Sequence, residues 1–421
     1  MQTESQVVGT EVERVNKVLP KMFDLEDYFY SMAEKSSAAQ PVSNRAMRIP
    51  LKLRPGGRFG HFNPDGTGPG SDMGLGDGPT YDKATITVAH LKYAIQWSKL
   101  AEWSTDSDRK AVVDAYQDLL AGAMPEFRRS VNSLCMTAGN GVLGTITTVA
   151  SASGVDTYTL TTDGFGVKLL RYGQPINIYD STLATNRTAA GERQLTYYDI
   201  PTSTIKVDAV TGAVAGDKVV VSGVSGASPV SLLGVPYHNS NASTGTWLGF
   251  DRLTTPEIRS NRVNAAGGLA LPFPRLAIAK IGDRVGKKNV KKGIKAFMHP
   301  AQKFAYESLG MLVSIIQKTA KDENLDLYFG DGMQMAGASV EDHYFWDKTR
   351  IDFLAMQYWG RAEMKPAAFY EVGGRKVFEV RGPSGGIQTS QLQYITVSFN
   401  LFNACPPAES YIDALTVPAG W

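Results

Sequence analysis

The sequence predicts an α+β protein that carries an inserted antiparallel β-barrel or sandwich. Three observations lead to this prediction. Alternating apolar and polar residues flank a glycine-rich stretch between residues 49 and 103, and apolar residues recur at helical spacing over 107–138. Residues 144–234 hold only thirteen charged side chains among many Thr, Ser, Gly and Val. A period of two indicates strands, whereas spacings of three and four indicate a helix.

The first 48 residues are mostly polar, and we expect an N-terminal arm with one short helix within Leu25–Lys35. Such a segment buries little of its own surface, so it needs the rest of the fold or another chain to order it. Residues 1–20 mix acids and bases without an apolar segment, so no signal peptide is expected. No run of 18 apolar residues predicts a membrane span.

Residues 49–103 predict a long extended hairpin. One strand covers Ile49–Phe59, and Ala84–Trp103 supplies the return strand and its continuation. Between them, six glycines within 66–78 and three prolines form a stretch that cannot pack into a core. This composition is typical of an exposed loop tip.

Residues 104–143 carry the clearest helical signal, an amphipathic helix over 107–138. Its apolar stripe includes Val112, Leu119, Phe127 and Leu134. Pro125 lies inside the pattern and lacks a backbone N–H, so we expect the helix to kink there.

Residues 144–234 contain short alternating runs separated by turn signals. We expect an inserted domain, because about 90 residues are enough to form an independent core. The predicted strands are Thr157–Thr161, Pro175–Tyr179, Thr204–Val210 and Lys218–Ser222.

Residues 235–421 return to mixed α/β structure. We expect a helix over Leu276–Val285 after two prolines, a buried strand at Lys295–His299, and a helix from Pro300 that Gly310 stops. A second helical run follows at Met311–Lys321. Later strands are predicted at Val377–Arg381, Leu392–Phe402 and Ile412–Val417.

The composition is that of an ordinary globular protein. Lys and Arg total 43 and Asp and Glu total 41, so the net charge of +2 argues against a chain that clamps nucleic acid as a whole. Disorder, collagen and coiled coil are excluded as descriptions of the whole chain. Cys135 and Cys405 cannot form a disulfide scaffold, and the chain has the cysteine usage of a cytoplasmic protein.

No catalytic, cofactor or metal site is predicted, and no cofactor is expected. The G-x-S-x-G match at 382–386 is followed by a strand pattern rather than a helix, which favours a β-turn. The run 282–287 is one residue short of a phosphate-binding loop and lacks its hydroxyl residue. The five histidines show no metal-ligand spacing, and no Cys-x-x-Cys occurs.

A basic run lies within Lys280–Lys295, with seven basic residues and one acid. Two interpretations stay open: a patch that faces a polyanion or an acidic neighbouring subunit, or a solvated helix end. The candidate residues are Lys287, Lys288, Lys291 and Lys292.

The order of these elements resembles a tailed-phage major capsid protein of the Hong Kong 97 fold. An arm and a hairpin of this length expose apolar and backbone groups that one chain cannot cover, which indicates self-assembly. The segments LLGVPYHNS (232–240), GFDRLTTPEIRSN (249–261) and AFMHPAQKFAYESLG (296–310) resemble pieces of that family.

The resemblance implies an N-arm (1–48), an E-loop (49–103), the spine helix of a peripheral domain (104–143), an inserted β-domain (144–234), and an axial domain with the rest of the peripheral domain (235–421). It also implies pentamers and hexamers that form an icosahedral head around double-stranded DNA in the virion, assembled in the host cytoplasm. Portal, scaffolding and cement proteins are implied partners. The E-loop would cross a neighbour, with interface residues Arg54, Arg58, Phe59, Phe62, Met73, Leu75 and Trp97.

Three alternatives remain at this stage. An encapsulin-type shell would share the fold but enclose protein cargo. An enzyme with a β-rich accessory domain would need Asp251, Glu257 and His299 in one pocket. A tail or tube protein would form helical filaments instead of closed heads.

Overall fold

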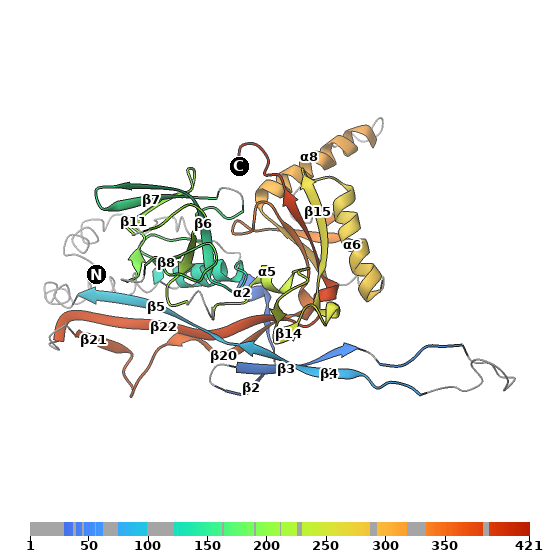
Figure 1. Ribbon diagram of the computed structural model, residues 1–421, viewed down its shortest axis with the longest axis horizontal. Coiled ribbons are helices and arrows are strands. Elements are labelled where there is room, and N and C mark those ends of the chain that lie inside the picture. The colour runs from blue at the N-terminus through green and yellow to red at the C-terminus, as the bar shows by residue number, and fades with distance from the viewer. Residues whose placement is uncertain are drawn as a thin grey trace, which may run out of the picture.

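The computed structural model describes residues 29–36, 39–43, 46–54, 56–61, 75–98, 122–123, 125–161, 164–188, 191–210, 212–224, 230–286, 293–317, 334–381 and 387–421, with backbone alone at 98, 310–317, 381 and 387–389. Within these residues three larger sheets form the body, and a three-stranded sheet projects from it (Figure 1).

The five-stranded sheet is organised by β22 (Ile387–Asn403), which is long enough to pair with two strands along one edge. These are β20 (Trp359–Phe369) and β21 (Val377–Arg381), while β5 (Ala89–Ser98) pairs along the other edge. The two-residue β1 (Glu34–Lys35) adds to β20 in parallel. The predicted strands at 377–381 and 392–402 are therefore confirmed.

The six-stranded sheet runs in the order β15-β23-β19-β16-β18-β17. Its inner strand β19 is buried at every position, as expected for a strand covered on both faces. Ala277 and Ile281 of α6 (Pro272–Val285) pack on this sheet, and the two prolines lie in the first turn, where a missing N–H costs nothing. The strand bounds are Asn261–Gly267 (β15), Ile294–Met298 (β16), Gln334–Met335 (β17), Ala338–Asp342 (β18), Ile351–Ala355 (β19) and Ser410–Leu415 (β23).

The helix after β16 corrects one prediction. α8 is continuous over Pro300–Gln317, so Gly310 does not stop it. Glycine inside a helix costs about 1 kcal/mol relative to alanine, which is far less than the cost of proline. The helical pattern on both sides of Gly310 outweighs that cost, and the two predicted helices form one.

A seven-stranded antiparallel sheet occupies residues 142–221, in the order β10-β11-β7-β6-β12-β8-β9. The strands at its two ends are β9 (Arg193–Gln194) and β10 (Tyr197–Asp199), which follow each other almost directly in the chain. The two ends of the sheet therefore lie side by side, and the sheet curls into a barrel. The four predicted strands correspond to β7, β8, β11 and β12 and are confirmed. The strand bounds are Val142–Ala152 (β6), Val155–Leu160 (β7), Pro175–Tyr179 (β8), Thr204–Asp208 (β11) and Lys218–Val221 (β12).

The barrel shares its core with the rest of the body. Leu143 and Ile205 belong to the same buried cluster as Phe127 on the helix over 125–135 and Phe399 on β22. Whether 144–234 is an inserted domain that folds alone stays a prediction. Residues 99–121 and 124, which include the predicted start of the long helix and the residue next to Pro125, lie outside the described residues, so the kink also stays a prediction.

The short helix α2 (Phe29–Met32) is fixed deep in this core. The Phe29 ring makes edge-on contacts with Phe297, Trp346 and Trp359, at centroid distances of 5.4 to 6.0 Å. Its backbone N–H donates to Asn132 Oδ1 at 2.9 Å. Aromatic pairs of this geometry add to the free energy of burial, so α2 is the point where the N-terminal part attaches to the body.

Candidate assembly surfaces

The projecting sheet consists of β2 (Gln40–Pro41), β3 (Ala46–Arg54) and β4 (Thr80–Thr87). β3 and β4 form the predicted hairpin, which extends far from the body (Figure 1). β5 belongs to the body, where it pairs with β22. The projecting hairpin therefore ends at Thr87, and residues 62–74, which include most of its predicted glycine-rich tip, lie outside the described residues.

Polar contacts continue the hairpin beyond its strands. The Gly57 N–H donates to the Asp77 carbonyl at 2.8 Å, and the Arg58 guanidinium donates to both carboxylate oxygens of Asp77 at 2.9 and 3.0 Å. Bidentate arginine–carboxylate pairs fix geometry as well as charge. Arg58 therefore holds the two limbs of the hairpin together.

Large apolar side chains are exposed along this hairpin. Phe59 is 98% exposed, Leu75 is 85% exposed and Tyr81 is 64% exposed. Single exposed apolar residues are common, but several on one slender projection indicate a surface that another protein covers. Among the other predicted interface residues, Phe62 and Met73 lie outside the described residues, and Trp97 packs against the chain's own core.

The root of the hairpin is fixed to the body. Met47, Ile49 and Ile86 share a buried cluster with Trp247 and Phe402. The Arg54 guanidinium also pairs with the Glu257 carboxylate at 3.0 Å. Arg54 therefore anchors the hairpin within its own subunit.

Close to this root lies a fully buried histidine, His238, at the end of α5 (Val235–His238). Trp247 Nε1 donates to its Nδ1 at 3.1 Å, so Nε2 carries the proton and donates to the Leu401 carbonyl at 3.1 Å. Burial lowers the pKa of His238 to about 3. The neutral ring thus links Trp247, nine residues away in the sequence, to Leu401 on β22, which is 163 residues away.

We expect this histidine to make the protein sensitive to acid. The unfolded chain takes up a proton near pH 6.5 and the native ring does not. Stability therefore falls as the pH drops from about 6.5 towards 3, by roughly 5 kcal/mol at most. His238→Gln keeps one acceptor and one donor, and should flatten this part of the curve in denaturant unfolding at successive pH values. An unchanged slope in the variant would contradict the assignment.

A buried carboxyl group lies where the five- and six-stranded sheets meet. Glu409 is fully buried and accepts a hydrogen bond from Nε1 of Trp359, at the start of β20, while Asn403 at the end of β22 lies beside it. Burial raises the pKa of Glu409 well above its usual range. The native state therefore holds this group protonated under conditions in which the unfolded chain releases the proton.

The expected pH effect of Glu409 has the opposite sign to that of His238. Above about pH 4.3 the unfolded state loses the proton that the native state keeps, so stability declines as the pH rises. Glu409→Gln keeps the acceptor for Trp359 and cannot ionise, so its melting temperature at pH 8 should exceed that of the wild type. The exposed Glu379→Gln is the matched control and should show no gain; a less stable Glu409→Gln protein at pH 8 would refute the prediction.

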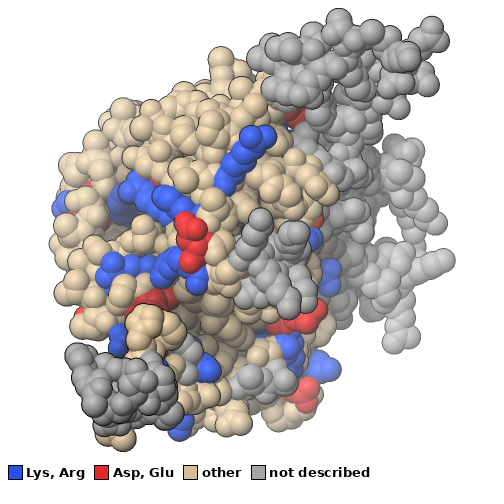
Figure 2. Space-filling model, turned by 90° about the vertical axis from the view of Figure 1, so that its right-hand side faces the viewer, with Lys and Arg blue, Asp and Glu red and all other residues tan. Residues whose placement is uncertain are grey.

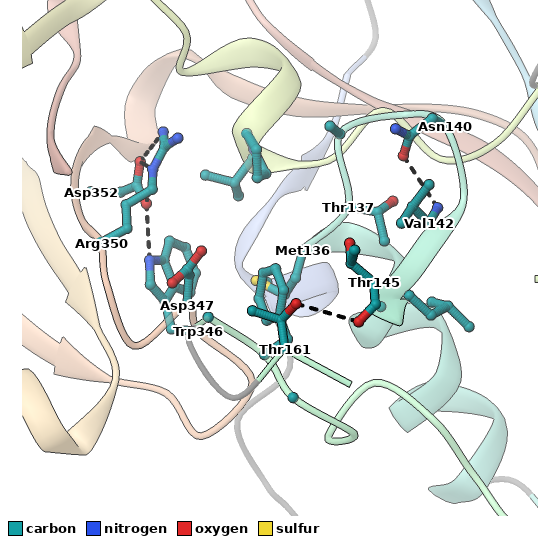
Figure 3. A pocket seen from close by; sticks show the side chains of 18 residues that line it. Met136, Thr137, Asn140, Val142, Thr145, Thr161, Trp346, Asp347, Arg350 and Asp352 are labelled. Atoms are coloured by element: carbon teal, nitrogen blue, oxygen red, sulfur yellow. Dashed lines mark hydrogen bonds and ion pairs between the residues drawn. The ribbon is translucent and has the colours of Figure 1, made fainter. Parts of the chain in front are cut away.

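A pocket of about 340 Å³ lies between the barrel, the end of the helix over 125–135 and the segment 346–352 (Figure 3). On one side Arg350 pairs with Asp352, which also accepts a hydrogen bond from Trp346 Nε1 at 2.9 Å. On the other side Thr161 donates to the Thr145 carbonyl at 3.3 Å. The described residues that line it include threonines and the carboxylates of Asp347 and Asp352, but no Ser, Cys or His.

Basic side chains gather on the face that carries α6 and β15 (Figure 2). Arg284 donates to the carbonyls of Arg259 and Pro256, and Lys280 donates to the Arg262 carbonyl at 2.6 Å. Backbone carbonyl groups hold these cations, and the Glu257 carboxylate also interacts electrostatically with Arg284. The predicted basic residues 287–292 follow α6 directly in the sequence but lie outside the described residues.

The residues considered for catalysis have separate partners. Asp251 accepts a hydrogen bond from the Leu253 N–H, Glu257 pairs with Arg54, and His299 contacts Lys168. Burial raises the pKa of the Cys135 thiol, which disfavours the reactive thiolate.

The described residues contain no group of three or more His, Cys, Asp or Glu that could hold a metal ion. Nor do they include a helix that is both long and apolar enough to span a membrane.

The long hairpin, the helix beneath the five-stranded sheet and the six-stranded sheet with its helices together define the Hong Kong 97-like fold, the architecture of tailed-phage capsid proteins. A chain in the cyanophage A-1(L) capsid asymmetric unit matches this structure with a TM-score of 0.50 at 14% identity, over 91% of each chain. This likeness shows the fold. No family model matches the sequence, and no curated protein sequence matches it.

Two further solved structures match with lower scores. The capsid of the native GTA particle matches with a TM-score of 0.43 at 11% identity, over 96% of this chain and 94% of the other. The holo-SrpI encapsulin complex from Synechococcus elongatus matches with a TM-score of 0.41 at 7% identity, over 99% and 96%.

Proposed function

We propose that this chain is the major capsid protein of a tailed double-stranded DNA phage. It is a structural subunit without catalytic activity, and it assembles into pentamers and hexamers of an icosahedral head. The observation that carries this proposal is the projecting hairpin, whose Phe59 and Leu75 are almost fully exposed on a capsid-type fold. A projection that fits a different site on an identical copy makes a heterologous contact, and such contacts close into rings and shells.

The proposal assigns a role to each part of the chain. Residues 1–48 are the N-arm, 49–103 the E-loop, 104–143 the peripheral spine helix and 144–234 an inserted β-domain. Residues 235–421 form the axial domain and complete the peripheral domain. The position of the hairpin, the helix over 125–135 beneath the five-stranded sheet and the separate six-stranded sheet support this division.

The proposed partners follow from the shell function. Copies of this chain are the principal partner, and the enclosed double-stranded DNA is the second. Portal and scaffolding proteins, and a cement protein on the outside, complete the virion capsid. The basic residues Lys287, Lys288, Lys291 and Lys292, which follow α6 in the sequence, are proposed to meet a polyanion or an acidic neighbouring subunit.

Negative-stain microscopy and size-exclusion chromatography of the purified protein test the proposal. Closed shells or ring-shaped capsomers are expected. A monomer at every salt and protein concentration would overturn it, and helical filaments would point to a tube protein instead. Particles from the natural source should retain nuclease-protected DNA, whereas a protein cargo would favour an encapsulin-type compartment.

A further inference from the structure

Lys168 and His299 form an unusual contact between the barrel and the six-stranded sheet. Lys168 lies in the turn over residues 164–169, and His299 is the residue between β16 and α8. The Lys168 Nζ lies 2.5 Å from His299 Nε2. The Trp421 ring packs edge-on against the imidazole, with a centroid distance of 5.8 Å.

The other ring nitrogen of His299 determines which atom carries the proton. The Ala301 backbone N–H donates to Nδ1 at 3.0 Å, so Nδ1 is unprotonated. A neutral imidazole with a free Nδ1 carries its hydrogen on Nε2, and Nε2 must then donate to Lys168 Nζ. An ammonium group has no lone pair to accept that hydrogen bond, whereas an uncharged amine has one.

The surroundings also disfavour a charge on this lysine. The positive end of the 18-residue helix α8 begins at Pro300, directly after His299. Within the described part of the chain no carboxylate forms an ion pair with Lys168. Burial and the nearby Lys348 lower the pKa of Lys168 to about 8, and burial with the two lysines lowers the pKa of His299 to about 3.

We propose that Lys168 loses its charge far more readily than an ordinary lysine and is a preferred acylation site of this protein, reacting with activated carbonyl compounds such as esters and anhydrides. The Lys168 amine first releases the hydrogen bond from His299 Nε2, and its lone pair then attacks the carbonyl carbon and forms the N–C bond of an amide. The bond from carbon to the leaving group breaks, and the amine proton passes to solvent. This proposal rests on the side chains named above and does not require the shell function.

Competitive labelling of the full chain with limiting N-acetoxysuccinimide tests the proposal. After unfolding, a heavy-isotope reagent labels the remaining lysines, and peptide mass spectrometry gives the rate at each site. At pH 7.5 roughly a quarter of an amine of pKa 8 is uncharged, against about one in a thousand for an ordinary lysine. A less basic amine is also a weaker nucleophile, which removes part of the advantage that Lys168 gains from its larger uncharged fraction. Lys168 should therefore react about tenfold faster than the exposed Lys206.

Two variants separate the contributions to this reactivity. His299→Asn keeps an acceptor for the Ala301 N–H but removes the donor to the amine, and Lys348→Gln removes the neighbouring charge. Both should move the pH midpoint of Lys168 labelling upward, with the melting temperature reporting any loss of folding. A wild-type midpoint above pH 10, or slower labelling of Lys168 than of Lys206 at pH 7.5, would overturn the proposal.

Discussion

Replacing Phe59 and Leu75 together with aspartate is expected to abolish shell formation and leave the subunit folded. Both side chains are almost completely exposed in the single chain, so the substitutions remove little within it beyond the contact of the Phe59 ring with His61. In an assembled shell the same positions would be covered by a neighbour, and each would bury an unpaired carboxylate. Burying an uncompensated charge costs about 3 to 5 kcal/mol per site. Microscopy and size-exclusion chromatography would measure the loss of assembly.

The matched control is Val214→Asp, which adds a carboxylate at a half-exposed apolar position of the barrel stretch. It should assemble as the wild type does, and Phe59→Tyr with Leu75→Met should retain shells because the apolar surface is kept. Melting temperatures of all three proteins should agree closely. Normal shells from the aspartate variant, or a large fall in its melting temperature, would contradict the assignment of the hairpin to an intersubunit contact.

The sequence predicted those elements whose pattern is local. The alternation in β3, the buried run of β16 and the helix α6 all follow from a few consecutive residues. β16 lies within one residue of its predicted bounds, whereas β3 covers Ala46–Arg54 instead of 49–59 and α6 begins at Pro272 instead of Leu276. The same locality explains the confirmed strands of the barrel. Gly310 does not stop α8, because the apolar pattern that continues beyond it outweighs the modest cost of one glycine.

Features that depend on distant residues could not be predicted in this way. Closure of the barrel requires that the segment 193–199 pair with β8 at one end and with β11 at the other. The contact between His238 and Leu401 joins positions 163 residues apart. Neither has a periodic signal, because the partner of a buried polar atom is determined by tertiary packing and not by neighbours in the chain.

Gly234 shows how such packing constrains a single position, and its replacement by alanine is expected to destabilise the fold severely. A Cβ atom there would lie 2.2 Å from the Cys135 carbonyl oxygen and 2.3 Å from the Thr137 carbonyl oxygen. Its φ of −85° is open to any residue, so the constraint is space and not backbone conformation. The helix over 125–135 ends at this point, and Leu233 beside it donates its N–H to Asn400 on β22 at 2.7 Å.

Neither neighbour of Gly234 can move easily, since one side is the backbone at a helix end and the other is tied to a central strand. We therefore expect Gly234→Ala to lower the free energy of unfolding by about 3 kcal/mol or more, or to prevent folding. Gly268→Ala is the control, because its Cβ would meet open space, and it should change stability by less than about 0.5 kcal/mol. Denaturant unfolding of both variants gives the comparison. Equal stabilities would show that the segment around Gly234 can shift away from the helix end, and that the junction between helix and sheet is looser than these contacts imply.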